Sequence, residues 1–133
     1  MTKLISFQFA VKSMLILLVA VMIFHLLILA GVIPFQIVWG GRLENEGEMY
    51  RFETVSIIVN LFILSVVLIR GGYWKVHVHE MIMRGTLWVL AFLFLMNTVG
   101  NIFSVNFWEM VIFTPLTFVS MIFCIRMSLE KTK

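Results

Sequence analysis

Four long apolar segments divide the 133-residue chain, and they constrain its fold more than any other feature. They cover residues 13–33, 52–69, 85–103 and 107–125. A helix needs about 20 residues, with a range of roughly 17–25, to cross the hydrocarbon core of a bilayer, and each segment has a length in this range. Since unpaired backbone groups are too costly in lipid, each segment is predicted to be a transmembrane helix. The sequence therefore predicts an all-α, polytopic membrane protein with four spans.

The composition excludes the other broad classes of protein. Hydrophobic residues make up 62% of the chain and charged residues 13%, whereas soluble domains are about 45–50% apolar and about 25% charged. Such hydrophobicity also excludes an intrinsically disordered chain. Because the spans leave no stretch for another domain, residues 1–133 are expected to form a single transmembrane domain. The net charge of +3 is divided between the two sides of the membrane, so its placement matters more than its sum, and no nucleic-acid partner is predicted.

Helix ends are indicated by residues beside the apolar segments. Pro34 follows the first segment and is expected to end that helix, because proline has no backbone N–H to donate. Gly71 and Gly72 follow the second segment, and glycine readily takes the left-handed conformation found at helix C-termini. Asn45 and Glu48 precede this segment with the spacing of a helix N-cap. The second helix is therefore expected to begin a turn or two outside the membrane.

The distribution of basic residues predicts the orientation of the helices. Eight of the ten lysines and arginines lie in the two tails or between the second and third segments. The opposite side has only Arg42 and Arg51. Because lysine and arginine concentrate on the cytoplasmic side, both termini are predicted to be cytoplasmic. The link over residues 104–106 is so short that the third and fourth helices must be antiparallel neighbours. The protein is expected to be an antiparallel four-helix bundle in a bacterial plasma membrane.

One polar residue in each predicted span lies at a similar depth. Counting about 1.5 Å per residue from the outer ends of the spans places His25, Asn60, Asn97 and Thr117 roughly 10–14 Å below the outer boundary. Polar side chains in a membrane normally face the bundle interior or a hydrated cavity. The sequence therefore predicts a polar pocket that opens to the outside, above a cytoplasmic half that is almost wholly apolar.

Further polar residues are expected above this layer. Glu53 and Asn101 lie on the same helical faces as Asn60 and Asn97, respectively. Arg42 follows the segment PFQIVWGG, in which Trp39 is a candidate interfacial anchor. The two glycines, Gly40 and Gly41, allow a turn that folds this segment over the mouth of the bundle, with Arg42 near Glu53 or a lipid phosphate. Pro115 is expected to free the carbonyl of Val111 in the same half of the membrane.

The predicted ligand-binding residues are His25, Arg42, Glu53, Asn60, Asn97, Asn101 and Thr117. Each also has a purely structural interpretation. Inward-facing asparagine and threonine side chains often join helices by hydrogen bonds worth about 0.6–2 kcal/mol. His25 is either hydrogen-bonded between helices or a ligand- or proton-binding group. Glu53 is either an interfacial structural acid or a functional carboxylate.

No cofactor, metal site or catalytic residue is predicted. His77, His79 and Glu80 have metal-ligand side chains, but most zinc sites need at least three protein ligands. These residues also fit the start of a helix at the interface. The single Cys124 excludes membrane oxidoreductases that use a pair of cysteines. Bis-histidine haem would need a second histidine within a span, and only His25 lies clearly inside one.

Three functions follow from these features. We favour a non-enzymatic protein whose outward-facing polar pocket binds a membrane lipid or small ligand, or docks a membrane partner protein. One alternative is a homo-oligomeric transporter or channel in which Glu53 or His25 takes up a proton or cation. The other is a lipid- or isoprenoid-modifying enzyme with these two residues as acid and base. Acid–base chemistry needs groups within hydrogen-bond reach, and the estimated depths of His25 and Glu53 differ by about 10 Å, which disfavours the enzyme.

Overall fold

The computed structural model describes residues 2–38 and 42–131, and over these ranges it contains four α-helices and no strand. The helices are α1 (Phe7–Leu29), α2 (Glu46–Arg70), α3 (Glu80–Ile102) and α4 (Phe107–Ser128), and a short 3-10 turn, η1 (Phe35–Ile37), follows α1. All four helices are long and apolar enough to cross a membrane. The predictions of an all-helical fold and of four helices able to span a membrane are confirmed.

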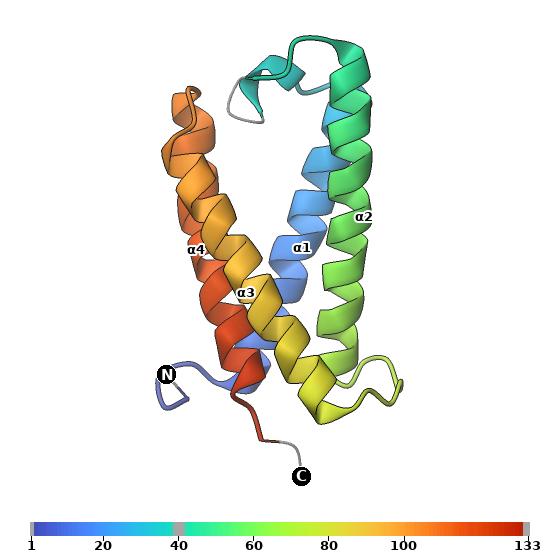
Figure 1. Cartoon of the computed structure of the whole chain (residues 1–133), viewed down its shortest axis with the longest axis vertical. Helices are drawn as coiled ribbons and strands as arrows, with labels where there is room; N and C mark the ends of the chain where they lie inside the picture. Colours follow the sequence, from blue (N-terminus) through green and yellow to red (C-terminus); the bar gives the residue numbers. More distant parts are fainter. Residues whose placement is uncertain (1, 39–41, 132–133) are drawn as a thin grey trace.

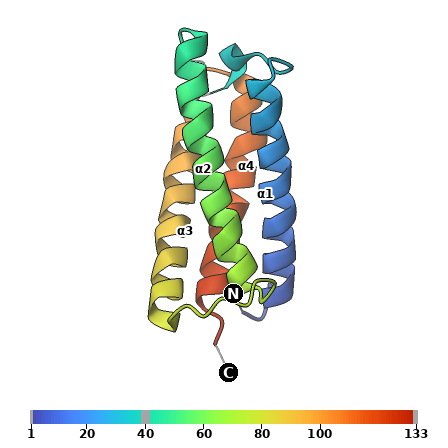
Figure 2. The same ribbon diagram turned by 90° about the vertical axis from the view of Figure 1, so that its right-hand side faces the viewer.

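The helices form two pairs, α1 with α2 and α3 with α4 (Figure 1). α1 also packs against α4, whereas α2 and α3 make the fewest contacts of these pairs. Both termini lie at one end of the molecule, which we call the basal end (Figures 1 and 2). The pairs lie close together there and diverge toward the opposite end, which we call the loop end (Figure 1).

The first helix ends before the predicted proline. α1 ends at Leu29, and Gly31 has a φ of +80°. The N–H of Val32 donates to the carbonyl of Leu27, which with the left-handed glycine forms a Schellman C-cap. The prediction that Pro34 ends this helix was therefore wrong, because the glycine turns the chain before the proline is reached.

Both predicted ends of α2 are confirmed. Asn45 is the N-cap, and its side chain accepts a hydrogen bond of 2.9 Å from the N–H of Glu48. Gly72 takes the left-handed conformation, with a φ of +82°. Gly71 has a second role, because a Cβ atom there would lie 2.6 Å from Cγ1 of Val11 on α1. The absence of a side chain at Gly71 thus permits the close approach of α1 and α2.

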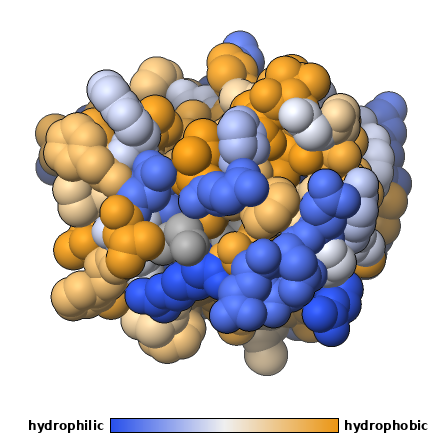
Figure 3. Space-filling model, turned by 90° about the horizontal axis from the view of Figure 1, so that it is seen from above, coloured by the Kyte–Doolittle hydropathy of each residue, from blue (hydrophilic) through white to orange (hydrophobic). Residues whose placement is uncertain are grey.

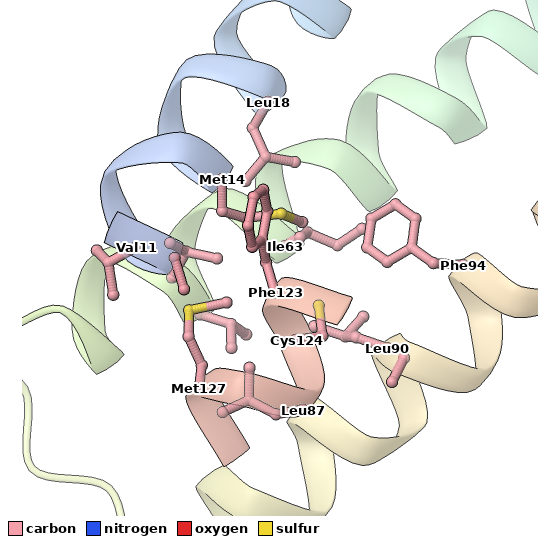
Figure 4. Packing of buried hydrophobic residues seen from close by; sticks show 14 of the residues in the cluster. Val11, Met14, Leu18, Ile63, Leu87, Leu90, Phe94, Phe123, Cys124 and Met127 are labelled. Carbon is pink, nitrogen blue, oxygen red and sulfur yellow. The ribbon is translucent and has the colours of Figure 1, made fainter. Parts of the chain in front are cut away.

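The hydrophobic core fills the basal half and draws on all four helices (Figure 4). Met14 on α1, Ile63 on α2, Leu87 on α3 and Cys124 on α4 are each at most 4% exposed. A smaller cluster at the loop end consists of Ile28, Val38 and Met49, which pack the end of α1 and the turn η1 against the start of α2. The two clusters leave the region between them, on the inner faces of the helices, for polar side chains.

Two buried arginines close the basal end. Arg70, at the end of α2, pairs with Glu80 at 2.9 Å and donates to the carbonyls of Met127 at 3.0 Å and Glu130 at 2.9 Å. Its side chain is only 5% exposed. Because carbonyls at a helix C-terminus lack partners within the helix, an arginine is a suitable donor to them.

Arg126 connects the two termini of the described chain at the same end. It donates from Nε to the carbonyl of Ile5 at 2.7 Å and forms an ion pair with Glu130 at 2.8 Å. The ring of Phe7 lies 6.0 Å from its guanidinium carbon and 5.9 Å from that of Arg70. We call Phe7, Arg70, Glu80, Arg126 and Glu130 the basal cluster. Arg70 and Arg126, which the sequence analysis counted as charges outside the spans, thus lie at the helix ends with their side chains turned inward below the apolar core.

Candidate functional site

A cavity of about 470 Å³ lies between the two helix pairs in the loop half of the molecule. Each of the seven sequence-predicted site residues lines it, together with Ser56, Glu109 and Ser120 as further polar groups. Most of the remaining wall is apolar and includes Val59 from α2 and Leu93 and Met96 from α3. The titratable side chains of the wall gather near the loop end, and the lower wall has only uncharged side chains. Figure 3 shows hydrophilic side chains gathered among hydrophobic ones at the loop end.

His25 and Glu53 form a hydrogen-bonded pair in this wall. Nδ1 of His25 lies 2.6 Å from Oε2 of Glu53. The Glu53 side chain is 0% exposed, and that of His25 is 15% exposed. The expectation that their depths differ by about 10 Å was wrong. It counted His25 from a span end near residue 33, whereas α1 ends at Leu29, so His25 lies about one helical turn from that end.

Arg42 lines the same cavity, and its side chain is exposed. Arg42 was expected to lie near Glu53, but the two residues do not form an ion pair. Glu53 is paired with His25, and no described residue forms an ion pair with Arg42. The predictions for Trp39, Gly40 and Gly41 lie outside the described residues. Arg42 therefore contributes a guanidinium group to the wall that no other described side chain neutralises by direct contact.

Asn60 joins α2 to α1. Its side-chain Nδ2 donates to the carbonyl of Leu18 at 3.1 Å, and the residue is 6% exposed. Leu18 is seven residues from His25 on α1, which corresponds to about 10 Å along the helix. His25 therefore lies well above Asn60, and the prediction that these two residues share one level was wrong.

A third polar group joins α3 to α4. Thr98 and Thr117 are hydrogen-bonded at 2.9 Å, and Nδ2 of Asn101 lies 3.4 Å from the same Thr117 hydroxyl. Thr98 was not predicted as a site residue, and Asn97 was expected to be the inward-facing polar residue of α3. Asn97 is exposed at the edge of the cavity and has no hydrogen-bond partner among the described residues. Adjacent helical residues differ by about 100° in direction, and the hydropathy of an apolar helix does not show which of the two faces inward.

The mouth of the cavity also carries an acid from α4. Glu109 lies in the first turn of this helix, where Asn106 is the N-cap, and it accepts a hydrogen bond of 2.6 Å from Ser104. Pro115 lies inside α4, which continues through it, so the carbonyl of Val111 loses its usual donor as expected. The neighbouring Thr114 hydroxyl is buried without a partner within the described ranges.

The histidine-rich segment before α3 has a structural role. His79 is the N-cap of α3, and its Nδ1 accepts a hydrogen bond of 3.2 Å from the N–H of Met81. Residues 2–38 and 42–131 contain no group of three histidine, cysteine, aspartate or glutamate side chains that could hold a metal ion. Of the two sequence interpretations of this segment, the structure therefore supports the helix start.

The four apolar helices are compatible with a small integral membrane protein that has an amphipathic cavity in one half. Comparison of the chain with protein-family models, with curated proteins and with solved structures gave no match. Its function is therefore inferred from the geometry of the cavity.

Proposed function

We propose that the protein is a non-enzymatic membrane protein that binds an amphipathic lipid in the cavity between its two helix pairs. The observation that carries this proposal is the gradient of charge along the cavity wall: the charged and titratable groups lie near the loop end, as His25, Glu53 and Arg42 do, while the lower wall has only uncharged side chains, including Val59 and Leu93. A volume of about 470 Å³ lies within the usual range of small-molecule pockets, roughly 300–1,000 Å³. A lipid headgroup with the first part of its chain matches both the size and the gradient.

The position of the cavity also favours a ligand that enters from the bilayer. α2 and α3 make few contacts with each other, and residues of both helices, including Val55, Val59 and Met96, line the cavity while remaining more than a third exposed. In a membrane, such a surface is next to lipid chains. A lipid that entered between α2 and α3 would keep its chain in hydrocarbon and place its headgroup among the polar side chains.

The proposal includes the orientation of the protein as an antiparallel bundle in a bacterial plasma membrane. The basal end carries most of the lysines and arginines, so we place it and both termini in the cytoplasm. The loop end then faces outward, and the polar part of the cavity lies in the outer half of the membrane. The ligand would be a lipid of the outer leaflet.

The interior below the cavity does not favour the transporter alternative. The lining reaches Ile63, Phe94 and Ser120, and beneath them the core cluster occupies the space between the helices. The basal cluster then ties the helix ends together. A dead-ended cavity suits a binding protein better than a path across the membrane.

A tryptophan placed in the apolar wall tests the proposal. Leu93→Trp would fill part of the cavity from α3, and Val89→Trp is a matched control one turn away on the same helix, at a position that is 68% exposed and does not line the cavity. Native mass spectrometry of the protein released gently from membranes would measure the retained lipid. We expect a defined lipid adduct on the original protein and on Val89→Trp, and its loss from Leu93→Trp.

Two results would contradict the proposal. One is a protein without any lipid adduct that is released as a complex with a membrane partner, which would make the cavity a docking site. The other is an adduct that survives Leu93→Trp, which would place the lipid elsewhere. Thermal unfolding in the same detergent shows whether each variant is folded.

A further inference from the structure

The His25–Glu53 pair leaves one ring nitrogen of His25 for a ligand in the cavity. Nδ1 of His25 is occupied by Glu53 at 2.6 Å, so Nε2 is the ring nitrogen left for a ligand. The ring lines the cavity, and its side chain is 15% exposed, whereas the carboxylate behind it is fully buried. Glu53 therefore fixes the orientation of the imidazole from behind, as carboxylates bonded to the other ring nitrogen do for functional histidines.

The hydrogen on Nε2 determines what the ring offers to a ligand. With hydrogen on this nitrogen, the imidazole donates a hydrogen bond, and the complementary ligand atom is an acceptor. An anionic oxygen is the strongest acceptor for such a donor.

The other charged groups of the cavity point to the class of acceptor. Besides the pair, the lining contains one cation, Arg42, and one further acid, Glu109, while α3 supplies no charged group. Glu109 belongs to α4, on the opposite helix pair, and accepts a hydrogen bond from Ser104. Among the described residues on the α1–α2 side of the cavity, Arg42 is the one cation and His25 the one imidazole, while the amide of Asn60 is bonded to the carbonyl of Leu18. A guanidinium group is well suited to bind phosphate oxygens.

We propose that Nε2 of His25 and the guanidinium of Arg42 bind the phosphate of the amphipathic ligand, so that the protein is specific for phosphate-bearing lipids. This inference rests on the proposed lipid-binding function and specifies the headgroup. The same chemistry would bind free inorganic phosphate, and the experiment below separates the two sources. Asn97, exposed at the edge of the cavity, is placed to contact the ester region beside the phosphate.

The test compares two lipids that share their acyl chains and differ in the phosphate. The full chain in detergent is titrated with dioleoylphosphatidic acid and with dioleoylglycerol, and the dissociation constants are measured. Hydrogen bonds to charged groups contribute enough for about a tenfold to hundredfold preference for the phosphate lipid. Arg42→Gln and the double variant His25→Phe/Glu53→Leu are expected to lose most of this preference, chiefly through weaker binding of the phosphate lipid.

The double variant is chosen because His25→Phe alone would leave the buried Glu53 without its imidazole and could unfold the protein. Replacing both partners with apolar groups removes the donor without leaving a buried charge. Arg51→Gln is the matched control for Arg42→Gln, since Arg51 is an exposed arginine of α2 that does not line the cavity, and this variant should keep the preference.

Each outcome separates this inference from the proposed function. Equal affinity for the two lipids, or a preference that survives in both Arg42→Gln and the double variant, would overturn the phosphate site and leave lipid binding intact. Binding of neither lipid would overturn the proposed function and the inference with it. Inorganic phosphate that binds alone as tightly as the phosphate lipid would support the phosphate site and overturn the lipid as its source.

Discussion

Nδ1 of His25 lies 2.6 Å from Oε2 of Glu53, although the two residues are 28 positions apart in the sequence. The contact joins α1 to α2 near the loop end, at the polar part of the cavity, where the smaller apolar cluster also holds the two helices together. The pair of a fully buried acid and a nearly buried histidine therefore both joins two helices and supplies polar groups to the cavity.

The first prediction concerns this pair. His25→Leu leaves the buried Glu53 without the imidazole of its ion pair, and breaking one side of a buried pair costs about 3–5 kcal/mol. His25→Leu/Glu53→Leu removes both polar groups and should be closer in stability to the original protein. Thermal unfolding in detergent measures both effects. A double variant as unstable as the single one would show that the pair itself, rather than the cost of burying the acid without the imidazole, supports the fold.

The second prediction separates two asparagines that sequence analysis treated alike. Asn60→Leu removes the hydrogen bond to the carbonyl of Leu18 and should lower the free energy of unfolding by about 0.6–2 kcal/mol. Asn97→Leu removes a side chain without a described partner, so stability should be unchanged while lipid retention falls. Unfolding and native mass spectra of the two variants provide the comparison. Equal loss of stability in both would mean that Asn97 is a structural contact.

The third prediction concerns the crossing of α1 and α2. Gly71→Ala would place a Cβ atom 2.6 Å from Cγ1 of Val11, a fully buried side chain, and overpacking of this kind costs about 1–3 kcal/mol. Gly85→Ala is the control, because its Cβ would meet no atom within 4 Å and alanine is up to about 1 kcal/mol better than glycine inside a helix. In a Val11→Ala background, the penalty of Gly71→Ala should shrink.

The fourth prediction concerns the basal cluster. Arg126→Leu removes the hydrogen bond to Ile5 and the ion pair with Glu130. Charge-assisted hydrogen bonds contribute about 1.5–3 kcal/mol each when buried, so thermal stability should fall markedly. Lys131→Leu is the control, since Lys131 is exposed. Equal stability of the two variants would show that the cluster does not hold the helix ends together.

The fifth prediction tests the proposed orientation. Cys124 is fully buried and should not react with a membrane-impermeant maleimide. A cysteine introduced at Glu46, at the loop end, should be labelled in intact cells, and one introduced at Lys131 should be labelled only after the membrane is opened. The reverse pattern would invert the protein in the membrane and place the polar part of the cavity on the cytoplasmic side.

Several features of the fold were accessible from the sequence because they depend on local properties. Hydropathy alone locates four helices, since a membrane-spanning helix is defined by its length and apolar composition. The cap at Asn45 and the left-handed Gly72 were also predicted, because each depends on the chemistry of a few adjacent residues. The end of α1 was wrongly predicted at Pro34, because the left-handed Gly31 ends the helix first.

For the site, by contrast, the sequence determined little beyond its general character. The sequence determined that the chain forms apolar helices with a few polar groups, because those groups are too costly to leave in lipid and must face the interior. Only the tertiary structure decided which of them meet. A shift of four residues in the end of a helix changes the depth of a side chain by about 6 Å, and this shift brings His25 level with Glu53. A step of one residue changes the direction of a side chain by about 100°, and this rotation places Thr98 rather than Asn97 against α4. Hydropathy is nearly uniform around such helices, so only the packing of the four helices fixes their rotation and depth.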